Sequence, residues 1–312
     1  MKDDIAGDPI SGLRWTRKTT RNIAEQLQRL DIQVSANTVA RLLAKMKFSL
    51  RTNRKRIESG FKPKPGHRER RNQQFLNIAS QRRQFERAAL PVISIDCKKK
   101  ETVGLFKNAG RTWRRKPQDV LDHDFRSDAI GMAIPYGIYD AQHNTGMVVV
   151  GSSRETPAFA VDSVAQWWRL RGRKCYCRAD RLLIVCDSGG GNSARSTVWK
   201  RDLQTKIANR YDLEITVCHY PPGASKWNPI EHQLFSQISN NWQGVPLNSY
   251  ETVVKRIRTT TTKPGLKVTA TFSSKKYDKG ETVHKAEMKS LNLESHKLLP
   301  QWNYTIKPYS SH

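Results

Sequence analysis

The order of apolar segments between residues 91 and 241 constrains the fold more than any other feature of this sequence. Segments typical of buried β-strands lie at 92–95, 133–140, 146–151, 181–186 and 213–218. The turn sequence AQHNT separates the second segment from the third, which predicts an antiparallel hairpin. Helical periodicity appears at 157–171, 194–209 and 228–241. A hairpin followed by alternating helices and strands favours an α/β fold, with a mixed five-stranded sheet and helices on its faces.

The ribonuclease-H-like architecture has this order of elements, and it is therefore the predicted fold class. Residues 99–130 form an insertion after the first strand, and an extra strand is expected there near Val103–Lys107. Beyond residue 245, the pattern predicts a helix near 249–261 and strands near 266–272.

Two short amphipathic patterns joined by a tight turn precede this core. The first pattern shows Ile23, Leu27 and Leu30, and the second shows Val39, Leu42, Leu43 and Met46. Ser35 stands where the N-cap of the second helix is expected. The pattern predicts a helix-turn-helix segment. Its second helix offers side chains suited to phosphates and to base edges in a major groove, namely Asn37, Thr38, Arg41 and Lys45.

A basic segment with Pro and Gly punctuation follows, and a polar helix is expected over 67–88. Its cations can track DNA phosphates electrostatically, and Arg54, Lys55 and Arg56 are the candidates for this contact. Any single residue of the segment also fits a solvated charge run. The predicted domains are a partial helix-turn-helix segment at 1–50, a basic linker and helix at 51–90, the α/β core at 91–245, and a C-terminal extension packing on the core at 246–312.

The net charge predicts a polyanionic partner. The 312 residues include 55 Lys and Arg against 28 Asp and Glu, a formal charge of +27. Nucleic acid is the commonest polyanion bound by such proteins. No apolar run approaches the roughly 20 residues of a membrane span, so no membrane partner is expected. The first residues lack the apolar core of a signal peptide and the five cysteines include no C-x-x-C pair, so we expect a cytoplasmic protein without disulfides.

Three acidic residues lie at the ends of predicted strands or on the helix that follows the last strand. Asp96 ends the first strand, Asp187 ends a later parallel strand, and Glu231 lies on the helix after the last strand. The carboxyl ends of neighbouring strands meet at one edge of such a sheet, so the three side chains are expected to converge. Converging carboxylates repel each other unless cations join them, which favours two Mg²⁺ or Mn²⁺ ions roughly 3.5–4 Å apart. Taken singly, each Asp also fits a helix cap or a turn.

The residues that follow Asp96 are candidates for DNA contact. Lys98, Lys99 and Lys100 would neutralise phosphates beside the metal ions, or form an exposed solvated run.

Four residues of the segment before Glu231 are candidates for accessory roles. His219 would steer the scissile phosphate or protonate a leaving group, or it is a hydrogen-bonded loop histidine. Trp227 would stack on an unpaired base or pack in the core, and Lys226 precedes it. Asn228 helps to start the helix of Glu231 and is a candidate for the metal shell.

Long motifs are spread over the chain, namely ISIDCKKKE, GLFKNAGRTW (104–113), AIPYGIYD (133–140), DSGGGNSARSTVWK (187–200), LEITVCHYPPGASKWNPIEHQLFS (213–236) and QWNYTI (301–306). Together they resemble the ISAzo-type branch of bacterial insertion-sequence DDE transposases. The resemblance implies a ribonuclease-H-like catalytic core, with the DDE triad on Asp96, Asp187 and Glu231. It also implies an enzyme that uses two Mg²⁺ or Mn²⁺ ions to cleave double-stranded DNA at element ends and to join them to target DNA. Joining two ends implies a homo-oligomer on DNA, at the nucleoid.

Members of this family usually carry a further helix-turn-helix region before the segment that matches GDPISGLRWTRKTTRNIAEQL. Here that segment starts almost at Met1, so we expect an N-terminally truncated or mis-started copy. One alternative is therefore a catalytically incompetent DNA-binding remnant. A Holliday-junction resolvase or ribonuclease H would share the carboxylates, but neither explains the helix-turn-helix segment with its basic arm.

Overall fold

The computed structural model describes residues 6–7, 14–15, 19–50 and 66–309. The chain divides into two compact units, Met1–Phe61 and Lys62–His312, here called the N-terminal unit and the sheet unit. In the N-terminal unit, β1 (Ala6–Gly7) pairs antiparallel with β2 (Arg14–Trp15). Helices α1 (Thr20–Gln28) and α2 (Ala36–Lys45) of this unit pack against each other.

Side-chain caps define where these two helices begin. Thr19 Oγ1 accepts a hydrogen bond from the Asn22 amide, and Ser35 Oγ accepts one from the Thr38 amide, each at 3.1 Å. The predicted N-cap at Ser35 is confirmed. Such caps satisfy amide groups that have no partner within the helix.

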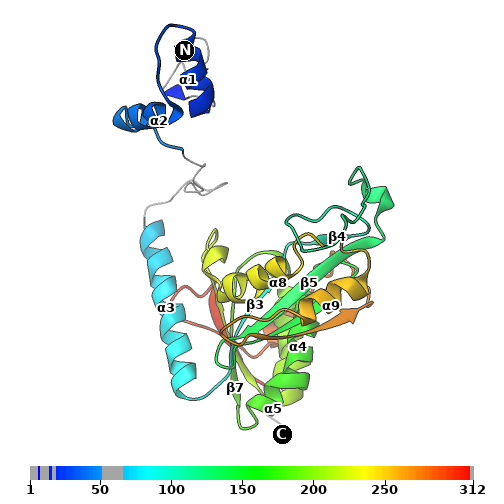
Figure 1. Ribbon diagram of the computed structural model, residues 1–312. Coiled ribbons are helices and arrows are strands. Elements are labelled where there is room, and N and C mark those ends of the chain that lie inside the picture. Colours follow the sequence, from blue (N-terminus) through cyan, green and yellow to red (C-terminus); the bar gives the residue numbers. More distant parts are fainter. Residues whose placement is uncertain (1–5, 8–13, 16–18, 51–65, 310–312) are drawn as a thin grey trace. The chain divides into compact units, whose positions relative to one another are not determined.

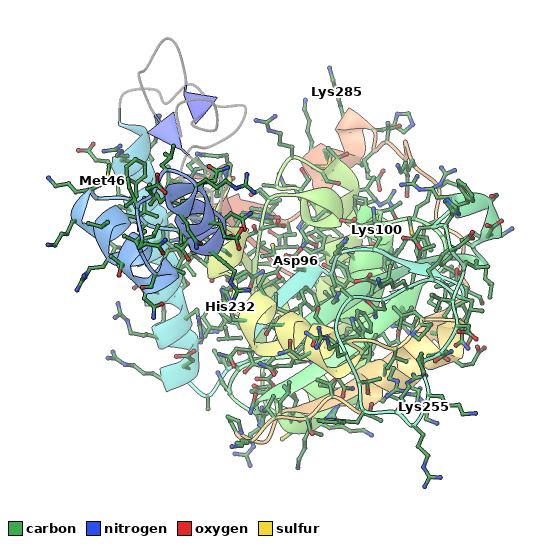
Figure 2. All side chains as sticks on the ribbon, turned by 45° about the horizontal axis from the view of Figure 1, so that its top comes forward. Met46, Asp96, Lys100, His232, Lys255 and Lys285 are labelled. Carbon is green, nitrogen blue, oxygen red and sulfur yellow. The ribbon has the colours of Figure 1, made fainter. Side chains whose placement is uncertain are left out.

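The apolar side chains of the N-terminal unit are only partly buried. Ile23 and Val39 are 2% and 3% exposed. Leu42 is 44% exposed and Met46, labelled in Figure 2, is 65% exposed. Within the described part of this unit, each of the two expected apolar faces is therefore buried at one residue and partly exposed at others.

The described part of the sheet unit forms one nine-stranded sheet, in the order β10-β11-β8-β7-β3-β5-β6-β9 with β4 paired to β5. The strands are β3 (Val92–Cys97), β4 (Glu101–Val103), β5 (Gly131–Asp140), β6 (Thr145–Gly151), β7 (Arg181–Cys186), β8 (Glu214–His219), β9 (Lys267–Ser273), β10 (Leu293–Ser295) and β11 (Asn303–Ile306). β5 runs antiparallel to β3 and β6, whereas β7 and β8 run parallel to β3. The strands β6-β5-β3-β7-β8 form the mixed five-stranded ribonuclease-H-like sheet, and this prediction is confirmed.

Strands outside the predicted five enlarge the sheet at both edges. β9 adds to β6 in parallel, and β11 adds to β8 antiparallel with β10 beyond it. The strand expected near Val103–Lys107 lies earlier, at Glu101–Val103, where it pairs with β5. The enlargement has a physical reason, since the edges of β6 and β8 would otherwise present unpaired backbone groups.

The described helices of this unit are α3 (His67–Arg87), α4 (Pro157–Trp167), α5 (Arg173–Cys175), α6 (Thr197–Leu203), α7 (Asn209–Tyr211), α8 (Ser236–Asn241), α9 (Tyr250–Arg258) and α10 (Lys285–Ser290). Single π-helical turns, η3 (Trp168–Gly172), η5 (Gln204–Ala208) and η7 (Glu231–Phe235), continue or begin three of the helical segments. None of the helices within the described ranges is long and apolar enough to cross a membrane.

The two faces of the sheet bury alternate residues of each strand. Ile93 and Ile95 belong to the cluster that contains Trp167 of α4 and Trp199 of α6. On the opposite face, α3 covers Leu183 and its neighbours, while η7, α8 and α9 cover β5 and β6. Figure 1 shows α8 and α9 on one side of the strands and α4 on the other.

Gly137 lets η7 approach the sheet closely. It lies opposite Asp96 in the β3–β5 pair, so the two residues face the same side. A Cβ atom added to Gly137 would lie 2.5 Å from Phe235 Cε1 and 2.9 Å from Ile230 Cδ1. Both contacts belong to the segment that carries Glu231, so the absence of a side chain here brings that segment down beside Asp96.

Gly137→Ala is expected to destabilise the protein by about 1–3 kcal/mol, because the buried ring of Phe235 must move. Urea unfolding would measure the loss. Thr145→Ala, at the half-buried start of β6, is the control and should change stability by less than about 1 kcal/mol. Equal stability of Gly137→Ala and the native protein would contradict this close packing.

Candidate active site

Asp96 and Asp187 lie at the ends of neighbouring strands. β3 and β7 are parallel, and Ile95 lies opposite Cys186 in their register. Each aspartate is the next residue along its chain, so both carboxylates come to the same edge of the sheet. Asp96 is 8% exposed, and its Oδ1 accepts a hydrogen bond from the Cys97 amide at 2.7 Å. Asp187 Oδ1 accepts one from the Gly189 amide at 3.1 Å.

Asn228 brings Glu231 to this edge. Its side chain is fully buried, and Nδ2 donates a hydrogen bond to the Ile95 carbonyl at 3.1 Å. The Glu231 amide in turn donates to the Asn228 carbonyl at 3.1 Å. Because Ile95 directly precedes Asp96, these two bonds fix the start of η7 beside the first carboxylate.

The carboxylates influence each other electrostatically. Burial raises the pKa of Asp96 well above its usual range, and the charges of Asp187 and Glu231 raise it further. Burial also raises the pKa of Asp187, with Glu155 adding to the effect. The structure thus brings the three predicted residues together, with Asp96 as the member that interacts with both others.

The donor chemistry of this group suits a hard divalent cation. All three side chains offer carboxylate oxygens, which Mg²⁺ and Mn²⁺ prefer. Asn228 Oδ1 is buried and has no hydrogen-bond partner among the described residues. Within those residues, no three His, Cys, Asp or Glu side chains form a ready-made metal-binding group. The three carboxylates therefore offer suitable donor atoms without forming a ready-made cation site among the described residues.

A fourth carboxylate, Glu155, was not among the residues expected from the sequence. Its Oε1 accepts a hydrogen bond from the Gly191 amide at 3.2 Å, and its Oε2 pairs with Lys100 Nζ at 3.0 Å. Its charge also raises the pKa of Asp187. Glu155 ends no strand and belongs to none of the long motifs; its one sequence signal is its place just before the Thr156–Pro157 start of α4. Glu155 thus connects the glycine-rich loop after Asp187 to Lys100.

The three lysines after Asp96 are placed differently from one another. Lys98 is 7% exposed, since its Nζ pairs with Glu101 at 2.7 Å and lies 4.4 Å from the Trp242 ring centre. It is therefore largely buried, although it also lines a cleft beside Glu231, and its contact with phosphate remains a prediction. Lys100 is engaged by Glu155, and Lys99 is exposed.

The accessory candidates also separate into buried and exposed groups. His219 is fully buried beneath Asp187, with Nδ1 2.9 Å from the Asp187 carbonyl oxygen, so its ring faces the protein and not a bound phosphate. Burial lowers the pKa of His219 to about 4, so its ring is neutral at pH 7. Trp227 is 58% exposed, and Lys226 Nζ lies 5.6 Å from its ring centre.

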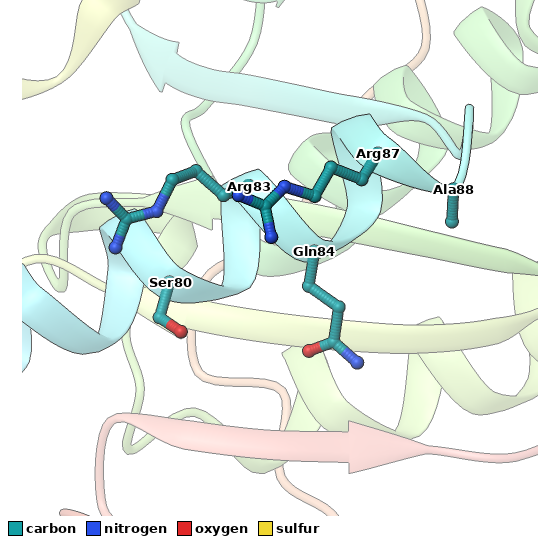
Figure 3. A pocket seen from close by; sticks show the side chains of 5 residues that line it. All are labelled: Ser80, Arg83, Gln84, Arg87 and Ala88. Atoms are coloured by element: carbon teal, nitrogen blue, oxygen red, sulfur yellow. The ribbon is translucent and has the colours of Figure 1, made fainter.

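A cleft adjoins Glu231 on the side of the insertion. Its lining includes Lys99, Asn108, Lys226, Glu231, His232 and Trp242. The lining thus combines lysines with the carboxylates Glu101 and Glu231. A second hollow, shown in Figure 3, lies along α3 and is lined by Ser80, Arg83, Gln84, Arg87 and Ala88. It is lined by two guanidinium groups and by no carboxylate, so it adds to the basic surface and lies apart from the three carboxylates.

The predicted DNA-binding residues of α2 are at the surface. Asn37, Arg41 and Lys45 are exposed. The Thr38 hydroxyl lies 3.0 Å from Ser35 Oγ and so takes part in the helix cap. Arg54, Lys55 and Arg56 lie outside the described residues. Figure 2 shows nitrogen-tipped side chains on every visible side of the sheet unit, with Lys255 and Lys285 at well-separated places.

Comparison with known proteins finds one family along nearly the whole chain. The family model of the Rhodopirellula transposase DDE domain (ISAZ013 type) matches residues 1–308. A comparison with curated proteins finds no match.

Solved structures of Mos1 transposase are more distant. The Mos1 transposase paired-end complex with left transposon end has a TM-score of 0.45 and 15% identity, over 76% of this chain and 65% of that one. The pre-cleavage Mos1 transpososome gives 0.44 and 15% over 76% and 65% of the two chains. The Mos1 mariner paired end complex with Mn gives 0.43 and 17% over 76% and 65%. The chain thus spans about 65% of the length of these structures, and the family match alone carries the assignment.

Asp96→Asn is expected to stabilise the metal-free protein at pH 8. The folded-state pKa of Asp96 lies above the unfolded value of about 3.9, so its stability contribution is present at low pH and is lost as pH rises through the folded pKa. Asparagine cannot ionise and avoids this loss. A melting temperature measured in EDTA should rise by a few degrees at pH 8 and stay unchanged near pH 4, since about 1 kcal/mol shifts Tm by roughly 2–4 °C.

Asp180→Asn is the matched control, because Asp180 is an exposed aspartate at the opposite end of β7. Its Tm should follow the native protein at both pH values. Added Mn²⁺ should raise Tm of the native protein at pH 8 more than that of Asp96→Asn. If Asp96→Asn melts at a lower temperature than the native protein at pH 8, the charge of Asp96 does not destabilise the metal-free protein.

Proposed function

The chain belongs to the family of the Rhodopirellula transposase DDE domain, and we propose that it cleaves DNA at the ends of its insertion sequence and joins those ends to target DNA. The substrate is double-stranded bacterial DNA at the nucleoid, as element ends and as target. One observation carries the proposal, which is the convergence of Asp96, Asp187 and Glu231 at the carboxyl edge of β3 and β7.

Two Mg²⁺ or Mn²⁺ ions are the proposed cofactors, and Asp96, Asp187 and Glu231 are the residues that would hold them. Support comes from the oxygen donors, their mutual repulsion and the unpartnered Asn228 Oδ1. When bound, such ions lower the pKa of an attacking water or hydroxyl and offset the charge that develops on a phosphodiester. The chain itself supplies orientation: Asn228 holds the start of η7, and the Gly189 amide holds the Asp187 carboxylate.

The proposed reaction has two steps, hydrolysis at the element end and then strand transfer to the target. Water first attacks the phosphorus at the element end, the bond from phosphorus to the 3′ oxygen breaks, and a 3′ hydroxyl remains on the element. That hydroxyl oxygen then attacks a target phosphorus, a new P–O bond forms, and the target strand leaves with its own 3′ hydroxyl. Neither step needs a covalent enzyme intermediate. Because two ends must be joined, we propose that the protein acts as a homo-oligomer on DNA.

Cleavage of labelled DNA that carries the flanking element ends is the direct test. With Mg²⁺ or Mn²⁺ the native protein is expected to nick at the element end and to join that end to a target duplex. EDTA should abolish both products. Asp96→Asn, Asp187→Asn and Glu231→Gln should each reduce the cleavage rate by at least about 10³-fold, because each removes a ligand charge.

Asp180→Asn keeps the charge change of these variants but moves it to the far end of β7, so it should cleave at the native rate. DNA affinity should survive in all four variants. Binding without cleavage under any metal would favour the DNA-binding remnant, and cleavage only of branched DNA would favour a resolvase. Full cleavage activity of Asp187→Asn would contradict the assignment of Asp96, Asp187 and Glu231 as the metal-holding residues.

The exposed cations of α2 are proposed to bind DNA phosphates or base edges. Arg41→Ala and Lys45→Ala should each weaken binding, and removal of one phosphate-binding cation should reduce the slope of log affinity against log salt by about 1. Fluorescence anisotropy with a labelled element end at several salt concentrations measures both values. Arg210→Ala, on α7 of the sheet unit, is the control and should leave the slope unchanged. Unchanged slopes in both α2 variants would exclude these contacts.

A further inference from the structure

The C-terminal motif QWNYTI contributes a buried strand to the sheet. β11 pairs antiparallel with β8, placing Asn303 opposite Cys218 and Tyr304 opposite Val217. Successive side chains of a strand point to opposite faces, so Asn303 and Tyr304 leave β11 in opposite directions. Both are almost fully buried, at 0% and 1% exposure, although each carries a polar group. Buried polar groups need hydrogen-bond partners. The hydrogen bonds of Asn303 and Tyr304 connect β11 to His219, which contacts Asp187.

On one face, Tyr304 joins a chain of hydrogen bonds. Trp199 Nε1 donates to Tyr304 Oη at 2.8 Å, and Tyr304 Oη lies 3.1 Å from His219 Nε2. His219 Nδ1 lies 2.9 Å from the carbonyl oxygen of Asp187. A carbonyl can only accept, so Nδ1 carries the proton of the imidazole. Nε2 must then accept from the Tyr304 hydroxyl, whose oxygen accepts from Trp199. Cys186 Sγ also lies 3.3 Å from Nδ1, where a protonated nitrogen leaves the sulfur only the acceptor role.

On the other face, Asn303 fixes β11 to α3. Asn303 Nδ2 donates to Gln74 Oε1 at 2.7 Å, and Gln74 Nε2 donates to Asn303 Oδ1 at 2.8 Å. The same Gln74 Nε2 donates to the backbone carbonyl of His219 at 2.8 Å. The His219 amide donates to the Trp302 carbonyl at 2.9 Å. The ring and the backbone of His219 are therefore both held from β11 and α3.

The Asp187 carbonyl accepts the hydrogen bond at the end of this network. The parallel pairing of β7 with β8 ends at Cys186 opposite His219, so Asp187 lies one residue beyond the ladder. Its carbonyl oxygen has no strand partner, and the His219 side chain takes that place. The ring thus holds the backbone from which the Asp187 carboxylate projects and from which the glycine-rich loop departs.

We propose that His219 and Tyr304 are positioning residues for Asp187, linking the C-terminal strand to the active site. The inference deepens the proposed function and rests on it only for its effect on cleavage. Groups that orient a metal-binding carboxylate typically change activity or metal affinity by 10- to 100-fold when removed. Tyr304→Phe removes one hydroxyl, leaving His219 Nε2 and Trp199 Nε1 without their partner.

Hydrogen–deuterium exchange of the full-length protein, without metal or DNA, tests the positioning directly. In Tyr304→Phe, the amides of the loop after Asp187, from Gly189 to Asn192, should exchange roughly tenfold faster, the change expected when one buried hydrogen bond is removed. Thr216→Val is the matched control. Its hydroxyl lies 3.1 Å from that of Thr305 and bridges the same two strands, β8 and β11, without contact to Asp187. Equal exchange of the loop in Tyr304→Phe and Thr216→Val would overturn the inference.

Variants of His219 separate positioning from simple packing. An asparagine amide nitrogen reaches the place of Nδ1 but has no counterpart of Nε2. His219→Asn should therefore loosen the loop about as much as Tyr304→Phe, whereas His219→Leu, which loses both bonds, should loosen it further. The cleavage rate should follow the same order, with Tyr304→Phe and His219→Leu 10- to 100-fold slower and DNA affinity unchanged. Equal loss in His219→Asn and His219→Leu would indicate packing alone.

The two proposals can fail independently. If the native protein cleaves no DNA but the loop loosens in Tyr304→Phe and His219→Leu and not in Thr216→Val, the proposed function fails and the positioning stands. If the native protein cleaves DNA and Tyr304→Phe keeps both the native rate and the native loop exchange, the positioning fails and the transposase proposal stands.

Discussion

The parallel pairing of β3 with β7 is the constraint on which the rest of the site depends. Its register places Ile95 opposite Cys186, so Asp96 and Asp187 leave the buried ladder at the same level. Burial raises the pKa of both carboxyl groups; the charge of Asp187 raises that of Asp96 further, and the charge of Glu155 adds to the rise at Asp187. The surrounding structure keeps them there. Asn228 fixes η7 to the Ile95 carbonyl, and His219 holds the Asp187 backbone where strand pairing has ended.

Continuous apolar runs made the central strands predictable, because a strand that is covered on both faces places apolar side chains on both. Asp96 and Asp187 were recognisable for the same reason, since a carboxylate at the end of such a run contrasts with its neighbours. Asn228 was linked to the start of its helix, although its bond to Ile95 joins residues 133 positions apart. The DNA-binding roles and the domain boundaries remain predictions.

The features that sequence reasoning missed depend on contacts between distant segments. β11 is only four residues long, and its amide pair with Gln74 spans 229 positions, so neither leaves a local periodic signal. Lys98 was expected at the surface because lysine usually is, but its ammonium lies over the Trp242 ring and forms an ion pair with Glu101. Glu155 lacked a signal because its partners, Lys100 and the Gly191 amide, come from two other elements.

The charge distribution links the basic surface to the need for metal ions. A chain with a formal charge of +27 attracts DNA over distances of about one Debye length, roughly 8–10 Å. At the sheet edge that carries Asp96 and Asp187, however, Lys98 and Lys100 form ion pairs with Glu101 and Glu155, so these two lysines do little to offset the charge of Asp96 and Asp187. Surface lysines can bring a phosphodiester close, but only cations between it and the buried carboxylates can offset their repulsion. On the proposed function, DNA attraction and metal dependence are therefore two parts of one electrostatic requirement, acting at long and at short range.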